Sequence, residues 1–130
     1  MPEREREQEI SDGELGVLKA LWDIGPASVR TVMEHLHNEG RKVAYTTVLT
    51  FLSRLEQKGY ASSDKTGQAY VYRATMSRNK VTKARLKDLV ENLFDGAAAP
   101  LVLQLMKTEK FTADEVAELQ KLIDQLDSKA

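Results

Sequence analysis

The chain has 130 residues, of which 42% are hydrophobic and 30% charged, and its net charge is −1; this is enough for one compact domain with a helical extension. It contains no cysteine, which excludes disulfide frameworks, thiolate metal sites and cysteine nucleophiles. No apolar run approaches the length of a membrane span, and the charged segment 1–9 lacks the apolar core of a signal peptide. We therefore expect a cytoplasmic protein with a flexible N-terminal tail and no membrane insertion.

The charges are unevenly distributed along the chain. Residues 1–40 carry 4 Lys/Arg and 9 Asp/Glu, residues 41–87 carry 11 and 2, and residues 88–130 carry 4 and 9. A basic middle between two acidic ends is typical of a protein whose central part alone faces phosphate. A merely solvated basic surface gives the same pattern, so charge by itself leaves nucleic acid as one of two interpretations.

Two short helices are predicted near the start. Ser11 and Glu14 have the spacing of a capping box, and leucines at helical intervals follow until Gly25-Pro26 ends the run. Ser28 is a suitable N-cap for a second helix that ends at Gly40. The inward residues predicted for this second helix are Val29, Val32, Met33 and Leu36.

A third helix is predicted from Tyr45 to Lys58, because apolar residues at positions 48, 51, 52 and 55 follow a helical period. Two strand-like runs follow, over residues 60–63 and 68–73, around a hairpin turn at 64–67. Three helices and a hairpin within about sixty residues are typical of the winged helix-turn-helix, with the third helix as recognition helix and the hairpin as wing. We therefore predict a winged-helix DNA-binding domain over residues 10–76.

Residues 77–130 are predicted to form a helical dimerisation region, which makes the fold class mainly α with a small β-hairpin. Ser77 caps a helix with inward residues at 81, 86, 89, 90, 93 and 94, a break follows at 97–100, and Thr112 and Glu115 form a second capping box. The stretch 101–106 is too apolar to leave in water, so we expect a homodimer; folding back onto the winged domain is the alternative. The residues expected at the dimer interface are Leu89, Leu93, Phe94, Leu101, Val102, Leu105, Met106, Val116, Leu119 and Ile123.

The third helix presents a polar face opposite its apolar one. Only Glu56 introduces an acid there, and three threonines in five residues are not explained by helix propensity. A threonine can hydrogen-bond base edges and pack its methyl on thymine, and an arginine can bind guanine with two hydrogen bonds. The predicted base-contacting residues are Thr46, Thr47, Thr50 and Arg54. Alternatively, the face is only solvated and its threonines bond their own helical turn.

Basic and polar residues around this helix are predicted to contact the DNA backbone, where they fix register without reading sequence. They are Arg41, Lys42, Tyr45, Ser53, Lys58, Lys65 and Arg73. Tyr70 and Tyr72 alternate along the second strand, and we expect them to pack against the helices rather than to contact phosphate.

Nothing in the sequence indicates an enzyme. His35 and His37 are two residues apart on a helix, so they point in different directions, and we expect solvated histidines and no metal site. There is no glycine-rich phosphate loop and no nucleophile elbow, and no catalytic residue or cofactor is predicted.

The competing functional hypothesis is a winged-helix protein-protein interaction module without sequence-specific DNA binding. Such a face needs an apolar anchor such as an exposed aromatic side chain, and we expect none on the third helix outside its core set.

Several segments together resemble the penicillinase-repressor (BlaI/MecI) family of winged-helix transcriptional regulators, over residues 10 to about 126. They are Ile10-Ser11-Asp12-Gly13-Glu14-Leu15, Leu21-Trp22, Gly25-Pro26-Ala27, the run from Thr47 to Gly59, Ala99-Pro100-Leu101-Val102 and the segment from Phe111 to Leu122. The resemblance implies a repressor that binds an inverted-repeat operator as a homodimer and controls β-lactamase-type or related stress-response genes.

The resemblance also implies a mode of induction. In some members a membrane-bound metalloprotease sensor acts upstream and the repressor is cleaved in its dimerisation region, at a bond that aligns with Gln104 and Leu105 here. Two features depart from the family: Thr46, Thr47 and Leu49 occupy a turn where members often have a basic residue, and the residues at the aligned bond differ. The copper-responsive branch uses C-terminal cysteines, which this chain lacks.

Overall fold

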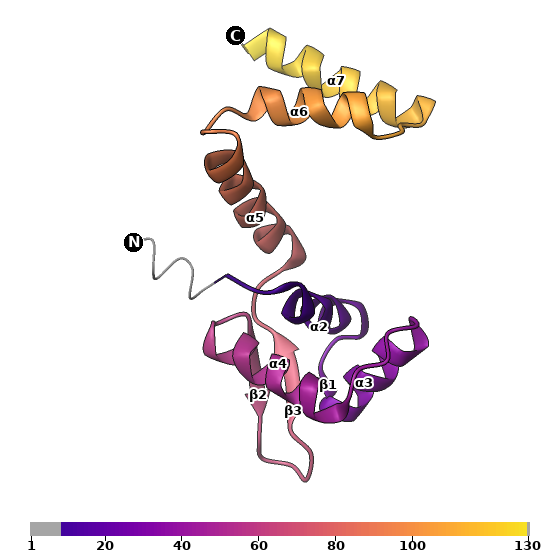
Figure 1. Cartoon of the computed structure of the whole chain (residues 1–130), viewed down its shortest axis with the longest axis vertical. Helices are drawn as coiled ribbons and strands as arrows, with labels where there is room; N and C mark the ends of the chain where they lie inside the picture. Colours follow the sequence, from indigo (N-terminus) through magenta and orange to yellow (C-terminus); the bar gives the residue numbers. More distant parts are fainter. Residues whose placement is uncertain (1–8, 130) are drawn as a thin grey trace. The chain divides into compact units, whose positions relative to one another are not determined.

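The computed structural model describes residues 9–129, so the predicted tail over residues 1–9 lies outside it except for Glu9 (Figure 1). The chain divides into two compact units, and the boundary in the sequence falls between Lys83 and Ala84. The first contains α2 (Asp12–Ile24), β1 (Ala27–Ser28), α3 (Val29–Asn38), α4 (Tyr45–Gln57), β2 (Ala61–Asp64), β3 (Val71–Ala74) and the start of α5 (Arg78–Leu93). The second contains the rest of α5, α6 (Ala98–Thr108) and α7 (Ala113–Lys129). The predicted fold class, mainly α with a small β element, is confirmed.

The predicted helix caps of the first unit are present. The Glu14 amide donates to Ser11 Oγ over 3.2 Å and the Ser11 amide donates to Glu14 Oε1 over 2.9 Å, which completes the capping box of α2. Ser28 Oγ accepts from the Thr31 amide at the start of α3. Both helices therefore begin where their side chains satisfy otherwise free backbone amides.

The sheet has three antiparallel strands in the order β1-β3-β2, one strand more than the predicted hairpin. β1 has two residues, which is too short to produce an alternating pattern in the sequence. The predicted hairpin is present, but its turn is longer than the predicted residues 64–67: Asp64 pairs with Val71, so the wing loop spans residues 65–70. The Asp64 side chain bonds Thr66 inside this loop, which stabilises a longer turn.

The core of the first unit lies between α2, α3, α4 and the sheet. Val48, Leu52 and Leu55 of α4 are completely buried, as the helical period predicts. Tyr72 is also buried, which confirms its expected packing. The same expectation is wrong for Tyr70, which precedes β3 in the wing loop and is 47% exposed. The remaining buried apolar residues are Ile10, Val17, Leu18, Ala20, Leu21, Ala27, Val29, Val32, Leu36, Ala61 and Val81.

Two glycines in α2 make room for residues from the α4 side of the unit. A Cβ on Gly13 would lie 2.6 Å from the Phe51 ring, and one on Gly16 would collide with the Arg41 guanidinium. Glycine inside a helix costs about 1 kcal/mol relative to alanine. At Gly13 the absence of a side chain lets α2 and α4 pack closely, and at Gly16 it makes room for the Arg41 side chain of the connector.

The second unit buries almost nothing within a single chain. Its predicted capping box is present, since the Thr112 amide donates to Glu115 Oε1 and the Glu115 amide donates to Thr112 Oγ1. The predicted break at residues 97–100 is misplaced, because α6 begins at Ala98. Pro100 is tolerated in the first turn of α6, because backbone amides there have no acceptor within the helix and the missing N–H of proline costs no hydrogen bond. Of the inward residues predicted for α5, only Val81 is buried, and none of residues 98–128 is buried. Among the described residues, no helix is long and apolar enough to cross a membrane.

Candidate nucleic-acid interface

The exposed face of α4 is held in place by its buried face. The side chains of Val48, Leu52 and Leu55 anchor the helix, and Thr46, Thr47, Thr50 and Arg54 are exposed on the other side. The structure therefore brings the predicted base-contacting residues together on one accessible surface.

One of the threonines bonds its own helical turn. Thr50 Oγ1 donates to the Thr46 carbonyl oxygen over 2.9 Å, which is the alternative raised for these residues from the sequence. Its hydroxyl proton is therefore engaged by the backbone, and only its oxygen lone pairs and its methyl group remain for a ligand.

Glu56, the acid on α4, is bonded to the wing rather than left unpaired. Its Oε2 accepts from the Ser63 amide over 3.1 Å and from the Ser63 hydroxyl over 2.8 Å. These bonds tie α4 to β2, which fixes the wing relative to the exposed face of α4.

Tyr45, the first residue of α4, is 45% exposed. The expectation that the third helix carries no exposed aromatic is therefore wrong, because a side chain at the first position extends beyond the core contacts of the helix. Ser53 is partly buried on the same helix.

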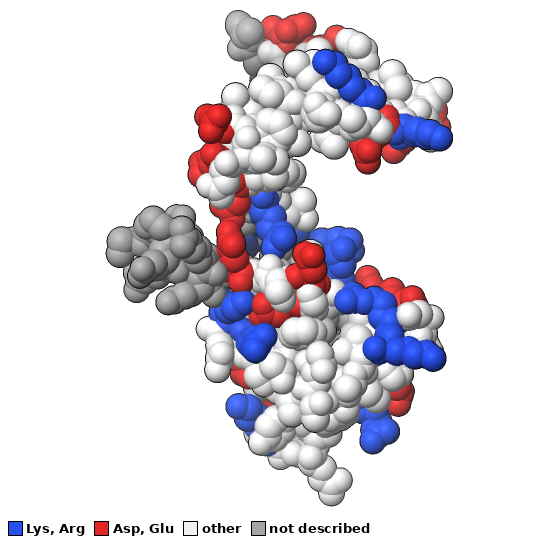
Figure 2. All heavy atoms as spheres, in the orientation of Figure 1, with Lys and Arg blue, Asp and Glu red and all other residues white. Residues whose placement is uncertain are grey.

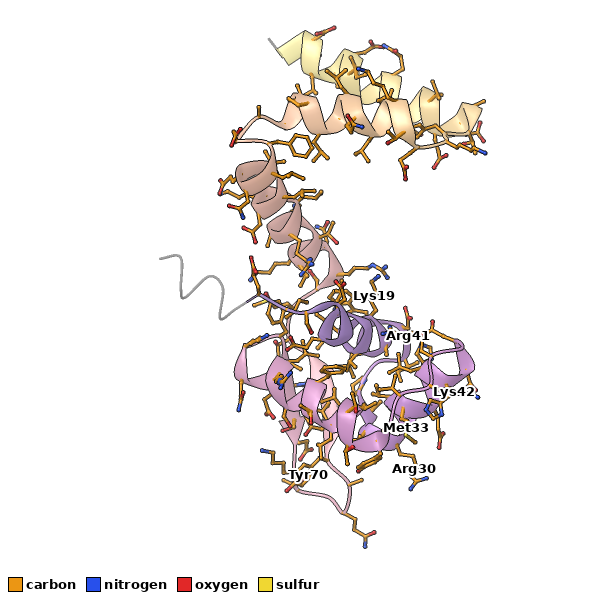
Figure 3. The ribbon with its side chains drawn as sticks, in the orientation of Figure 1. Lys19, Arg30, Met33, Arg41, Lys42 and Tyr70 are labelled. Atoms are coloured by element: carbon orange, nitrogen blue, oxygen red, sulfur yellow. The ribbon has the colours of Figure 1, made fainter. Side chains whose placement is uncertain are left out.

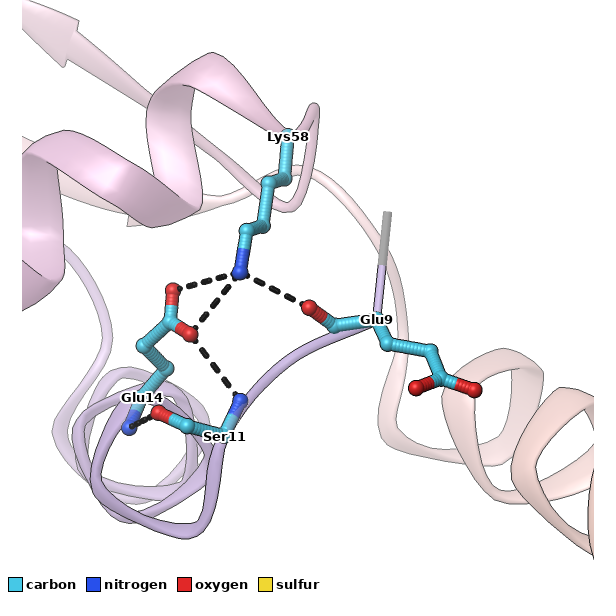
Figure 4. Close-up of polar contacts among 4 residues, drawn as sticks. All are labelled: Glu9, Ser11, Glu14 and Lys58. Atoms are coloured by element: carbon cyan, nitrogen blue, oxygen red, sulfur yellow. Dashed lines mark hydrogen bonds and ion pairs between the residues drawn. The ribbon is translucent and has the colours of Figure 1, made fainter. Parts of the chain in front are cut away.

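Lys58 occupies a different environment from the other predicted backbone-contacting residues (Figure 4). Its Nζ donates to Glu14 Oε1 over 2.9 Å, to Glu14 Oε2 over 3.0 Å and to the Glu9 carbonyl over 2.7 Å. Its side chain is 22% exposed and that of Glu14 only 3%. The Lys58 ammonium is thus engaged in a nearly buried ion pair that joins the start of α2 to the end of α4.

The pKa of Glu14 reflects this environment. Burial acts to raise the pKa, but the hydrogen bonds from the Ser11 amide and the Lys58 ammonium outweigh it and hold the pKa below the ordinary value. Glu14 is therefore a structural carboxylate at neutral pH.

The wing carries two of the predicted phosphate-contacting cations. Lys65 Nζ lies 5.6 Å from the centre of the Tyr70 ring, and Arg73 Nε donates to Ser62 Oγ over 3.2 Å. Both residues are exposed. Hydrogen bonds from Thr66 lower the pKa of Asp64, so this carboxylate is charged at the base of the loop.

A basic flank on the first unit joins residues that are distant in sequence. Figure 3 shows Lys19 of α2, Arg30 of α3 and the connector residues Arg41 and Lys42 along one side of the unit, and Figure 2 shows Lys and Arg side chains gathered there. All four are exposed. The sequence analysis did not include Lys19 and Arg30. Lys19 is three residues after Gly16 and therefore lies on the same face of α2, but the proximity of Gly16 to Arg41 is visible only in the structure.

The two histidines differ. His37 is exposed and its Nε2 bonds the Val43 carbonyl over 2.9 Å, which holds the connector before α4. The prediction of solvated histidines is wrong for His35, whose Nε2 is buried beside Asp23. The sequence does not show that the last turn of α2, which carries Asp23, lies next to His35 of α3.

The residues predicted for dimerisation are accessible in the single chain. Leu93 is 66% exposed and Val102 51%, and the others are exposed or partly buried. Gln104 and Leu105 lie in the middle of α6.

A family model described as penicillinase repressor matches residues 10–125. The penicillinase repressor of Bacillus licheniformis is 23% identical, with 90% of this chain and 91% of the relative covered. The transcriptional regulator BlaI of Mycobacterium tuberculosis is 28% identical, with 92% and 86% covered. Among solved structures, the DNA-binding domain of the repressor BlaI is 30% identical with a TM-score of 0.48, covering 54% of this chain and 84% of that one.

Proposed function

This chain belongs to the penicillinase repressor family, and we propose that it represses transcription by binding an inverted-repeat DNA operator as a homodimer. The observation that carries the proposal is the exposed face of α4, which is rich in hydroxyls and free of unpaired acid because Ser63 engages Glu56. The names of the relatives, penicillinase repressor and transcriptional regulator, support the same function. We expect the regulated genes to be of the β-lactamase type or related stress-response genes.

Base reading is assigned to the exposed side chains of α4. Arg54 can donate two parallel hydrogen bonds to guanine, and Thr46 and Thr47 can bond base edges or pack on a thymine methyl. Thr50 offers mainly its methyl and an accepting oxygen, because its proton goes to the Thr46 carbonyl. A helix of this width fits the major groove of B-form DNA.

Phosphate contacts are assigned to the exposed residues around α4. Arg41 and Lys42 precede the helix, and Lys65 and Arg73 belong to the wing. On α4 itself, the exposed Tyr45 and the partly buried Ser53 offer hydroxyls. We add Lys19 and Arg30 of the basic flank and leave out Lys58, whose ammonium is held by Glu14. These cations release condensed counterions on binding, which makes affinity strongly salt-dependent.

The second unit supports dimerisation. Residues 84–128 contain no buried side chain in the single chain, yet they include Leu86, Leu89, Leu93, Val102, Leu103, Leu105, Met106, Val116, Leu122, Ile123 and Leu126, each 38% exposed or more. An apolar surface of this extent is unfavourable in water and is typical of a homodimer interface. Two protomers then present two α4 helices to two half-sites about one helical turn apart, or a multiple of it.

Upstream of the repressor, a membrane-bound metalloprotease sensor is the partner proposed on the family resemblance, together with cleavage of the repressor at the Gln104–Leu105 bond. Because this bond lies within α6, cleavage requires the helix to unfold locally, and it would divide the proposed dimerisation surface.

Selection of bound fragments from the source genome by the purified chain tests the proposal. We expect enrichment of an inverted repeat, and a random duplex of equal length serves as the control for non-specific binding. The selection is repeated over a salt series. If no sequence is enriched at any salt concentration, sequence-specific repression is ruled out, and binding of a protein partner by the α4 face becomes the hypothesis to test.

A further inference from the structure

Three side chains with metal-binding atoms converge where α2 and α3 meet. Asp23 lies in the last turn of α2, and His35 and Glu39 are four residues apart at the end of α3, so they share one helix face. His35 Nε2 lies 3.4 Å from Asp23 Oδ2 and 3.6 Å from Glu39 Oε1, and all three ligand atoms lie within 4.8 Å of one another.

The central nitrogen of this group has no hydrogen bond. His35 Nε2 is buried and without a hydrogen-bond partner among the residues that the structure describes. Its distances to the two carboxylates exceed the 2.7–3.2 Å of an ordinary N–H···O bond. A buried nitrogen held only by these two long ion-pair contacts is poorly satisfied, so the arrangement favours a ligand placed between the three groups.

We propose that Asp23, His35 and Glu39 bind one divalent transition-metal ion, with Zn²⁺ as the best fit. Two ligand atoms that each lie about 2.1 Å from a tetrahedral zinc are about 3.4 Å apart. The separations of His35 Nε2 from the two carboxylate oxygens match this value. One imidazole and two carboxylates also suit a borderline cation, with water in the fourth position.

The exposure of the ligands is consistent with entry of an ion from solvent. The side chain of Asp23 is 44% exposed and that of Glu39 50%, so both carboxylates can rotate toward the ion without disturbing the core. Their two negative charges balance the charge of the cation. His37 is not part of the site, because its Nε2 bonds the Val43 carbonyl.

Metal binding at this place links the ends of two helices. The ion would join the last turn of α2 to the C-cap of α3, immediately before the connector that carries Arg41 and Lys42 to α4. Because the unfolded chain lacks the preformed site, binding stabilises the folded state.

The test is titration of the full chain, freed of metal with a chelator, with Co²⁺ as a coloured probe for a zinc-type site and with Zn²⁺ in competition. We compare the wild type with His35→Gln, Asp23→Asn and Glu39→Gln. The matched control is Glu34→Gln, which removes a carboxylate from an exposed position beside His35.

We expect one Co²⁺ per chain with a visible absorption band, displaced by Zn²⁺. Each ligand substitution should weaken binding by on the order of ten-fold or more, and Glu34→Gln should leave it unchanged. Saturating Zn²⁺ should raise the thermal midpoint of the wild type by several degrees and that of His35→Gln by much less. Failure of Co²⁺ or Zn²⁺ to bind at millimolar concentration, or equal binding by His35→Gln, overturns the proposal.

Discussion

The ion pair between Glu14 and Lys58 determines how α2 and α4 meet. The Glu14 side chain is 3% exposed, so its charge depends on the Lys58 ammonium and the Ser11 amide. Removing one partner of a buried pair is more damaging than replacing both, because the remaining charge is left without compensation.

Lys58→Met should therefore destabilise the chain by about 2–4 kcal/mol, somewhat less than a fully buried pair, because Lys58 is 22% exposed. Adding Glu14→Gln to Lys58→Met should recover part of the loss. Urea unfolding of the single and double variants measures both effects, and strict additivity would show that the two residues do not interact.

The same carboxylate predicts a dependence on pH. The pKa of Glu14 is lower in the folded chain than in the unfolded one, so its contribution to stability is present above the unfolded pKa. That contribution is lost as the pH falls through the folded pKa. The stability difference between wild type and Glu14→Gln should therefore shrink from about pH 7 to about pH 3 in urea unfolding; a constant difference contradicts the assignment.

At the interface, Arg54 and Lys65 are expected to act differently. Arg54→Ala should weaken binding to the operator by about 1–3 kcal/mol more than binding to random DNA, because a base contact is lost. Equal losses on both duplexes would move Arg54 to the phosphate-contacting set.

Lys65→Ala should weaken both kinds of binding and reduce the slope of log affinity against log salt by about one unit. Binding isotherms over a salt series measure this slope. An unchanged slope would show that the ammonium, which lies over the Tyr70 ring, stays there in the complex.

At the scale of elements, the fit of α2 against α4 depends on a missing side chain. Gly13→Ala places a Cβ 2.6 Å from the Phe51 ring, so the gain in helix propensity is exceeded by overpacking. We expect a net loss of about 1–2 kcal/mol in thermal or urea unfolding. Gly67→Ala is the matched control: its Cβ meets only the Ala69 carbonyl at 3.7 Å, and its stability should be nearly unchanged. Equal losses of stability in Gly13→Ala and Gly67→Ala would show that the contact with Phe51 is not the cause.

Most of the helices could be predicted from the sequence because they have a local signal, but the start of α6 at Ala98 has no side-chain cap to mark it. Ser11, Ser28 and Thr112 cap helices where their spacing indicates, and the period of α4 identifies its buried face. β1 could not be predicted, since its two residues are defined only by pairing with β3. The wing loop was predicted too short because Gly67 suggested a tight turn, whereas the Asp64–Thr66 bonds set a longer one.

The candidate site was predictable to the extent that it lies on one helix. Thr46, Thr47, Thr50 and Arg54 share a face through helical spacing alone. The engagement of Lys58 by Glu14 depends on residues 44 positions apart, which no local pattern reveals. The basic flank and the Asp23–His35 contact require the same long-range information.

At the scale of the whole molecule, dimerisation depends on apolar side chains of the second unit. Leu105 of α6 is 43% exposed in the single chain, so Leu105→Glu should place a charge in the proposed interface. We expect light scattering to give the 14.6 kDa of one chain for this variant and twice that mass for the wild type. Gln104→Glu, at the neighbouring position, is the control and should remain dimeric. A monomeric wild type at micromolar concentration would exclude the two-half-site arrangement.

The most direct measurement is the affinity of the wild-type chain for its selected inverted repeat, compared with the same duplex carrying one or both half-sites scrambled, over a salt series. We expect the intact site to bind about 10³-fold or more tightly than the fully scrambled duplex, with the half-scrambled site between them. All three should weaken steeply with salt. Equal affinity for the three duplexes at every salt concentration would contradict recognition of DNA sequence by a pair of α4 helices.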